Sequence, residues 1–136
     1  MTGWRVGYAA GSRVIIDKMI KLQENLVACV ATSSQYAAMK ALDTLDRASE
    51  MTEIYRERRD LIVEGLNNIK GISCIKPKGS FYVFPNIKAL GKTSEEVANE
   101  LLEKAGVITV PGSAFGAQGE GYLRISYANS LDNIKE

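Results

Sequence analysis

Two arginines stand in contexts that could bind an anionic ligand. Arg124 lies in the largely apolar stretch GYLRISYAN, and Arg5 follows the only tryptophan of the chain in TGWRVGYAAG. A guanidinium is planar, permanently charged and able to donate two parallel hydrogen bonds to a carboxylate or a phosphate. Strand alternation places Arg124 on the face opposite Leu123 and Ile125. Both arginines also have an ordinary interpretation. Arg124 could be a solvated residue of a half-buried strand, and Arg5 a residue at a strand edge.

Two glycine-containing segments have the composition of ligand-binding loops. NIKALGKTS ends like a P-loop, but Asn86 stands where that motif needs its first glycine, and Thr93 with Glu96 forms a helix capping box. Phosphate binding is therefore not favoured there. VPGSAFGAQGEG, residues 110–121, holds four glycines and one proline. This composition is typical of a mobile surface connection or of a loop shaped around a ligand.

The composition excludes several classes of function. The chain has 136 residues, no histidine, and 17 basic against 16 acidic residues. Common zinc sites and Ser–His or Cys–His nucleophiles are excluded without histidine, so no metal site is expected. The balanced charge argues against a nucleic-acid surface, and no apolar run is long enough to span a membrane. We expect one domain, a cytoplasmic location, and reduced thiols at Cys29 and Cys74.

Hydrophobic periodicity predicts the elements that position these residues. Helices are predicted at residues 12–26, about 35–45, 46–69 and 93–106, and again from Ser130. Strands are predicted at residues 72–77, 80–85, 107–112 and 121–128. Two of these helices carry a clear apolar stripe. The residues predicted to face inward on the helix at 46–69 are Met51, Ile54, Tyr55, Ile62, Leu66 and Ile69. On the helix at 93–106 they are Val97, Leu101 and Leu102. This order predicts an α+β fold with helices packed on one side of a small three- to four-stranded sheet, whose parallel or antiparallel character stays open.

Four segments taken together resemble the class I aminotransferases, the pyridoxal-phosphate enzymes of the aspartate aminotransferase type. They are MTGWRVGYAAG, KGSFYVFPNI, VPGSAFG and GYLRISYANS, which follow the family's order along essentially the whole chain. The resemblance implies the small C-terminal domain of a fold-type I enzyme. Residues 1–11 would be a remnant of the large cofactor-binding domain, and residues 12–136 the small domain with its final helix truncated. It also implies a homodimer that transfers an amino group between an α-amino acid and a 2-oxo acid.

The resemblance assigns roles to three residues. Arg5 matches the arginine that binds the phosphate of pyridoxal 5'-phosphate, and Arg124 matches the arginine that binds the substrate α-carboxylate. Phe81, in GSFYVFP, is the residue expected to approach substrate. In the family a lysine before the TGWR motif forms the Schiff base, which would place it upstream of Met1. No catalytic residue is therefore assigned, the cofactor is not expected to be bound covalently, and the chain alone is expected to be inactive.

Two further interpretations remain open. A carbon–sulfur β-lyase, or another fold-type I pyridoxal-phosphate enzyme, would use Arg5 and Arg124 in the same way, because both chemistries need the phosphate and the carboxylate bound. A non-catalytic, self-associating module is the other alternative. In the family the strand RVGYAA belongs to the sheet of the large domain, so here it would expose an unpaired edge. We expect it to be disordered, swapped or paired with a second copy.

Overall fold

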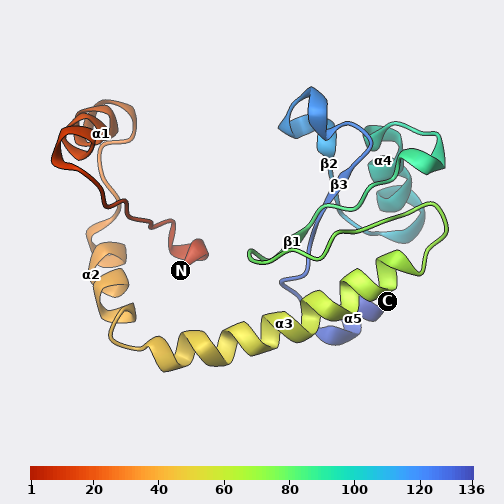
Figure 1. The fold of residues 1–136 in the computed structure, drawn as a ribbon, viewed down its shortest axis with the longest axis horizontal. Helices are drawn as coiled ribbons and strands as arrows, with labels where there is room; N and C mark the ends of the chain where they lie inside the picture. Colours follow the sequence, from red (N-terminus) through yellow and green to blue (C-terminus); the bar gives the residue numbers. More distant parts are fainter. The chain divides into compact units, whose positions relative to one another are not determined.

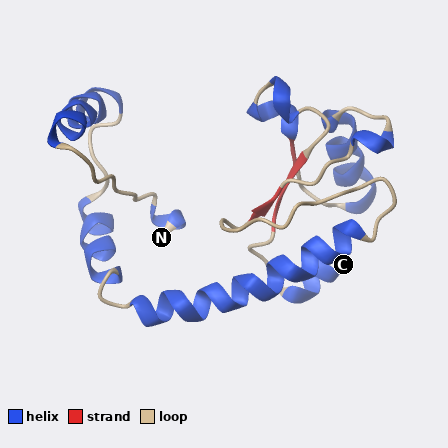
Figure 2. Ribbon diagram, in the orientation of Figure 1, coloured by secondary structure: helices blue, strands red, loops and turns tan.

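The computed structural model describes residues 1–136, with Leu45 described only as the first residue of its helix. The helices are α1 (Arg13–Leu26), α2 (Thr32–Ala41), α3 (Leu45–Asn67), α4 (Ser94–Ala105) and α5 (Leu131–Lys135). The strands are β1 (Tyr82–Val83), β2 (Val110–Pro111) and β3 (Leu123–Ser126) (Figures 1 and 2). The chain divides into two compact units, Met1–Ser49 and Glu50–Glu136.

The first unit contains α1 and α2. The expected helix after Ser12 is confirmed as α1, although the Ser12 side chain makes no capping hydrogen bond. The helix predicted at about residues 35–45 is α2, which begins earlier, at Thr32, and ends at Ala41. Serine and threonine cost a helix only a few tenths of a kcal/mol each, roughly, so a short polar segment does not exclude the first turn.

The segment RVGYAA, which belongs to a sheet of the large domain in the family, forms no strand here. Residues 2–4 make one 3-10 turn, Arg5 follows in a left-handed conformation (φ 53°), and residues 6–10 belong to no helix or strand. A strand needs a neighbour to satisfy its backbone groups. The described part of the first unit has no other strand, so this segment stays unpaired within its own unit.

A three-stranded antiparallel sheet forms the centre of the second unit. Its order is β1–β3–β2, with Val83 opposite Ile125 and Val110 opposite Arg124. β1 and β2 run in the same direction but are separated by β3, so the strand–helix–strand segment makes no parallel pair. The strand predicted at residues 72–77 is wrong apart from one bridge, between Ser73 and Asn86.

A side chain replaces that missing strand. The amide of Asn67, at the end of α3, donates to the Cys74 carbonyl at 3.0 Å. The Asn67 side-chain oxygen also accepts from the Cys74 N–H at 2.8 Å. Both backbone groups of Cys74 are therefore satisfied without a neighbouring strand, which the β-branched pattern alone could not reveal.

The core lies on one face of the sheet, and three helices contribute to it. Val83, Leu123 and Tyr127 are each 2% exposed or less. Two clusters cover them, one with Val63, Tyr55, Ile62 and Leu66 of α3 and Ile134 of α5, the other with Val97, Ala98 and Leu101 of α4. The predicted α+β arrangement, with helices on one side of a small sheet, is confirmed with three strands.

The helix faces differ from their predicted pattern at several positions. Leu102 is 50% exposed, and Ala98 is buried in its place. Met51, Ile54 and Ile69 are also exposed, while Val63 is the buried residue of α3. A contact with a small sheet covers only part of a long helix, so the ends of the apolar stripe remain outside the second unit's core.

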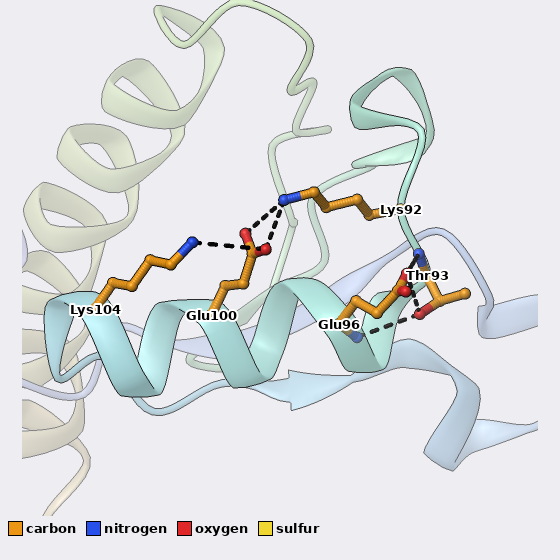
Figure 3. Close-up of polar contacts among 5 residues, drawn as sticks. All are labelled: Lys92, Thr93, Glu96, Glu100 and Lys104. Carbon is orange, nitrogen blue, oxygen red and sulfur yellow. Dashed lines mark hydrogen bonds and ion pairs between the residues drawn. The ribbon is translucent and has the colours of Figure 1, made fainter.

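The N-terminus of α4 explains the segment that resembles a P-loop. Thr93 Oγ1 accepts from the Glu96 N–H at 3.2 Å, and the Glu96 carboxylate accepts from the Thr93 N–H at 2.8 Å, which confirms the capping box (Figure 3). The Lys92 ammonium lies 2.6 Å from the carboxylate of Glu100, and Lys104 approaches the same carboxylate at 3.7 Å (Figure 3). Lys92 is thus engaged in an ion pair and caps no phosphate-binding loop.

Candidate functional site

Arg124 lies on the face of the sheet opposite the buried core. Alternation along β3 directs Leu123 to the core, and the neighbouring Arg124 to the other face. The register with β1 places Tyr82 opposite Ser126. Ser126 is two residues from Arg124 in sequence, so it is the next residue of β3 on the same face. The predicted alternation of this strand is confirmed by burial, because Leu123 is 2% and Tyr127 1% exposed.

The guanidinium of Arg124 lies against two aromatic rings. Its central carbon is 4.5 Å from the centroid of the Tyr82 ring and 5.0 Å from that of Phe115. The side chain is half-buried. Within the described residues of the second unit it makes no hydrogen bond and no salt bridge. A half-buried cation with its N–H groups uncommitted is suited to bind a carboxylate.

The loop that carries Phe115 is compact. Residues 112–115 and 117–119 form two 3-10 turns. The backbones of Gly112 and Gly119 touch so closely that a Cβ on either would collide with the other. The Gly112 N–H donates to the Tyr122 carbonyl at 2.8 Å, which continues the pairing of β2 with β3. The loop is thus closed by its own backbone contacts, and its role as a loop shaped around a ligand stays a prediction.

Glu120 attaches this loop to the start of α4. Its carboxylate accepts from the Ser94 N–H and from the Ser94 hydroxyl, each at 2.8 Å, and from the Gly121 N–H at 3.0 Å. Ser94 is completely buried, and its hydroxyl lies 3.2 Å from that of Ser113. The hydrogen bond from the Ser94 backbone is the first cause that lowers the pKa of Glu120, so the carboxylate stays ionised at neutral pH.

Phe81 lies beside the Arg124 site, and its ring packs toward the core. It contacts the cluster that contains Val83 and Tyr127, and its ring centroid is 6.3 Å from that of Tyr55. The Phe81 and Tyr82 centroids are 4.4 Å apart, so Phe81 touches the residue that covers Arg124. The sequence analysis missed Tyr82 and Phe115. Alternation in SFYVFP could have indicated Tyr82, because positions 81 and 83 share one face and 82 the other. No local signal indicates Phe115.

Arg5 lies in the first unit and is exposed. Its Nη1 donates to the Thr2 carbonyl at 3.2 Å, which closes the short turn around Trp4. The remaining guanidinium donors have no partner among the described residues of this unit, so they fit an anion such as a phosphate.

Other site types find no support in the described residues. No group of three acidic or cysteine side chains there could hold a metal ion, and Cys29 and Cys74 are both free. None of the described helices combines the length and apolar character needed to cross a membrane. Arg124, half-buried beside Tyr82 and Phe115 on an α+β scaffold, stays the candidate for an anion site in the second unit.

Comparison with known proteins identifies the family. The model for aminotransferase class I and II matches residues 1–136, so the chain belongs to that family. It is 45% identical to a putative aminotransferase, YugH, of Bacillus subtilis and 45% identical to an aspartate aminotransferase of Pyrococcus horikoshii. Both alignments cover the whole chain but only 35% and 36% of those relatives. The chain therefore spans about a third of the length of these relatives.

Solved structures give the same result. The crystal structure of an aromatic aminotransferase from Pyrococcus horikoshii superposes with a TM-score of 0.84 at 44% identity, over 99% of this chain and 37% of that one. An aspartate aminotransferase from Rhizobium meliloti gives a TM-score of 0.81 at 41% identity, over 99% and 36%. The predicted relationship to a C-terminal part of a fold-type I aminotransferase is confirmed. Such enzymes generally use pyridoxal phosphate.

Proposed function

We propose that the protein to which this chain belongs is a pyridoxal-phosphate-dependent aminotransferase, which transfers an amino group between an α-amino acid and a 2-oxo acid. The observation that carries this proposal is the state of Arg124. Its guanidinium is half-buried, flanked by two rings and free of any carboxylate partner in the described second unit. In a chain of this family, such a group is suited to bind the α-carboxylate that all its amino-acid and 2-oxo-acid substrates share.

The residues present also fit the cofactor. Arg5 is exposed and retains guanidinium donors that could bind the phosphate of pyridoxal 5'-phosphate. When bound, pyridoxal phosphate supplies an electron sink for the bonds at the substrate α-carbon. Arg5 would hold the phosphate and so fix the cofactor's position. Arg124 would orient the substrate through its carboxylate, and Phe81, whose ring touches that of Tyr82, would lie close to the bound substrate.

The remaining features of the proposal concern the whole protein. Residues 1–11 are proposed to belong to the large cofactor-binding domain and residues 12–136 to the small C-terminal domain. The absence of regular pairing in residues 6–10 supports a role within a larger sheet. We propose a cytoplasmic homodimer. We also propose that the 136 residues alone are inactive, because the relatives they match are almost three times as long.

The test is an assay of the complete protein supplied with pyridoxal phosphate, a panel of amino acids and 2-oxoglutarate. Wild type should form a 2-oxo acid and glutamate in equal amounts. Arg124→Leu should raise the KM for the amino donor by about 100-fold, since a charge-assisted bidentate contact contributes about 1.5–3 kcal/mol. Arg13→Leu, at an exposed surface arginine, is the control and should change nothing.

The same assay separates the alternatives. Formation of a 2-oxo acid together with ammonia and a thiol, without any need for an acceptor, would instead identify a β-lyase. If no amino acid reacts under any of these conditions, the proposed function is wrong.

A further inference from the structure

The guanidinium of Arg124 lies over two aromatic rings that come from different parts of the second unit. Tyr82 belongs to β1, which pairs with one edge of β3, and Phe115 belongs to the loop that follows β2 on the other edge. Their ring centroids lie 4.5 and 5.0 Å from the guanidinium carbon. A cation over a ring face is attracted by the ring's quadrupole, and more strongly where water is partly excluded. The rings thus favour one position of a side chain that is otherwise long and flexible.

Phe115 is itself held in place by the geometry of its loop. The contact between Gly112 and Gly119 closes the loop at its base, and the hydrogen bonds from Ser94 to Glu120 attach its far end to α4. The Phe115 ring also meets that of Phe84 edge-on at 6.1 Å. Phe115 is nevertheless 53% exposed, so its burial alone does not explain its position. The cation that lies over its ring is the guanidinium of Arg124.

We propose that Tyr82 and Phe115 are positioning residues for the carboxylate-binding arginine. Glu120 contributes by attaching the loop that carries Phe115 to α4. This inference rests on the proposed function. Both rings lie against the guanidinium carbon without taking up any of its N–H groups, so an incoming carboxylate can accept two parallel hydrogen bonds from them. Ordering Arg124 before the ligand arrives lowers the entropy cost of binding. Neither ring reacts, and each acts only through Arg124.

The first experiment measures steady-state kinetics of the complete protein with three variants. Phe115→Leu should raise the KM for the amino donor by about 2- to 30-fold, the range expected for a cation–π contact, and change kcat much less. Phe115→Tyr keeps a ring and should retain the wild-type KM. Tyr122→Leu is the matched control, because it removes a ring that stacks on Phe84 and contacts Lys88, while both rings on Arg124 remain. Equal effects of Phe115→Leu and Tyr122→Leu on KM would overturn the proposal.

The second experiment does not depend on enzymatic activity. In the complete protein labelled with ¹⁵N-arginine, the Arg124 Nε–H signal, assigned with Arg124→Lys, should be shifted upfield by the two ring currents. Phe115→Leu should move this signal downfield and broaden it, Glu120→Gln should do so partly, and Tyr122→Leu should leave it in place. An unchanged signal in Phe115→Leu overturns the inference even if the protein proves to be an aminotransferase. A signal that moves as expected sustains the positioning of Arg124 even if the proposed function fails.

Discussion

Glu120 and Ser94 are joined by two hydrogen bonds across 26 residues of sequence, one from the Ser94 N–H and one from its hydroxyl, each 2.8 Å long. The carboxylate thus binds at the N-terminus of α4, where a helix carries unsatisfied N–H groups and a partial positive charge. Thr93 and Glu96 satisfy the same terminus from within the helix. Glu120 adds a link from the loop of Phe115 to the helix, so the stability of this loop depends on an ionised carboxylate.

Replacing Glu120 with glutamine should therefore destabilise the protein in a pH-dependent way. The folded-state pKa of Glu120 is lowered, chiefly by the hydrogen bond from the Ser94 backbone, so its stabilising effect is complete above the ordinary value of 4.5. This effect is lost as pH falls through the lowered folded-state pKa. Urea denaturation followed by circular dichroism should show wild type more stable than Glu120→Gln at pH 7, with the difference shrinking below about pH 4.5.

Glu103→Gln is the control for that comparison. Glu103 is an exposed residue of the same helix, α4, with no hydrogen bond or salt bridge to other described residues. Its replacement should change stability by less than about 0.5 kcal/mol at either pH. If the difference in unfolding free energy between wild type and Glu120→Gln stays constant from pH 7 to pH 3, the ionised carboxylate does not have the role proposed for it.

Gly112→Ala should be strongly destabilising. A Cβ at this position would collide with the backbone of Gly119 and of Tyr122, and backbone atoms cannot move aside as a flexible side chain can. We expect a loss of about 1–3 kcal/mol or more in the free energy of unfolding, measured by urea denaturation. Gly79→Ala is the matched control, because nothing lies within 4 Å of its added Cβ. Similar stabilities of the two variants would show that the close contact does not constrain the loop.

Tyr127→Phe should cost about 1 kcal/mol or slightly more. The Tyr127 hydroxyl donates to the Ser80 carbonyl at 2.7 Å, and the side chain is 1% exposed. Burial is the first cause that raises the pKa of this phenol, which keeps it a donor over the usual pH range. The variant leaves the Ser80 carbonyl without its partner. Tyr122→Phe, which removes a hydroxyl without any hydrogen bond in the described structure, should be close to neutral in the same denaturation experiment.

Gly65→Ala should stabilise the protein. Gly65 lies inside α3, and an added Cβ would have nothing within 4 Å. Glycine in a helix interior costs about 0.5–1 kcal/mol relative to alanine, mainly through backbone entropy of the unfolded chain. The thermal midpoint should rise by a few degrees, since about 1 kcal/mol corresponds to roughly 4–8 °C in a small domain. A lower midpoint would show that Gly65 makes a close contact in the protein.

The sequence determined the elements whose signals are local. The capping box at Thr93, the left-handed Gly106 that ends α4, and the N-cap at Ser130 each depend on residues within one or two helical turns. The alternation in GYLRISYAN similarly fixed which residues of β3 face the core and placed Arg124 on the other face. The family motifs indicated Arg5, Phe81 and Arg124 as candidate site residues, and their roles stay predictions.

Only the tertiary structure decided what surrounds Arg124 and what holds it. The antiparallel register, the use of Asn67 in place of a strand beside Cys74, and the rings of Tyr82 and Phe115 all join residues distant in sequence. Such contacts exist only once segments that are distant in the chain pack together. Periodicity describes each segment against a generic core, so it can assign a face but cannot name the partner that faces it.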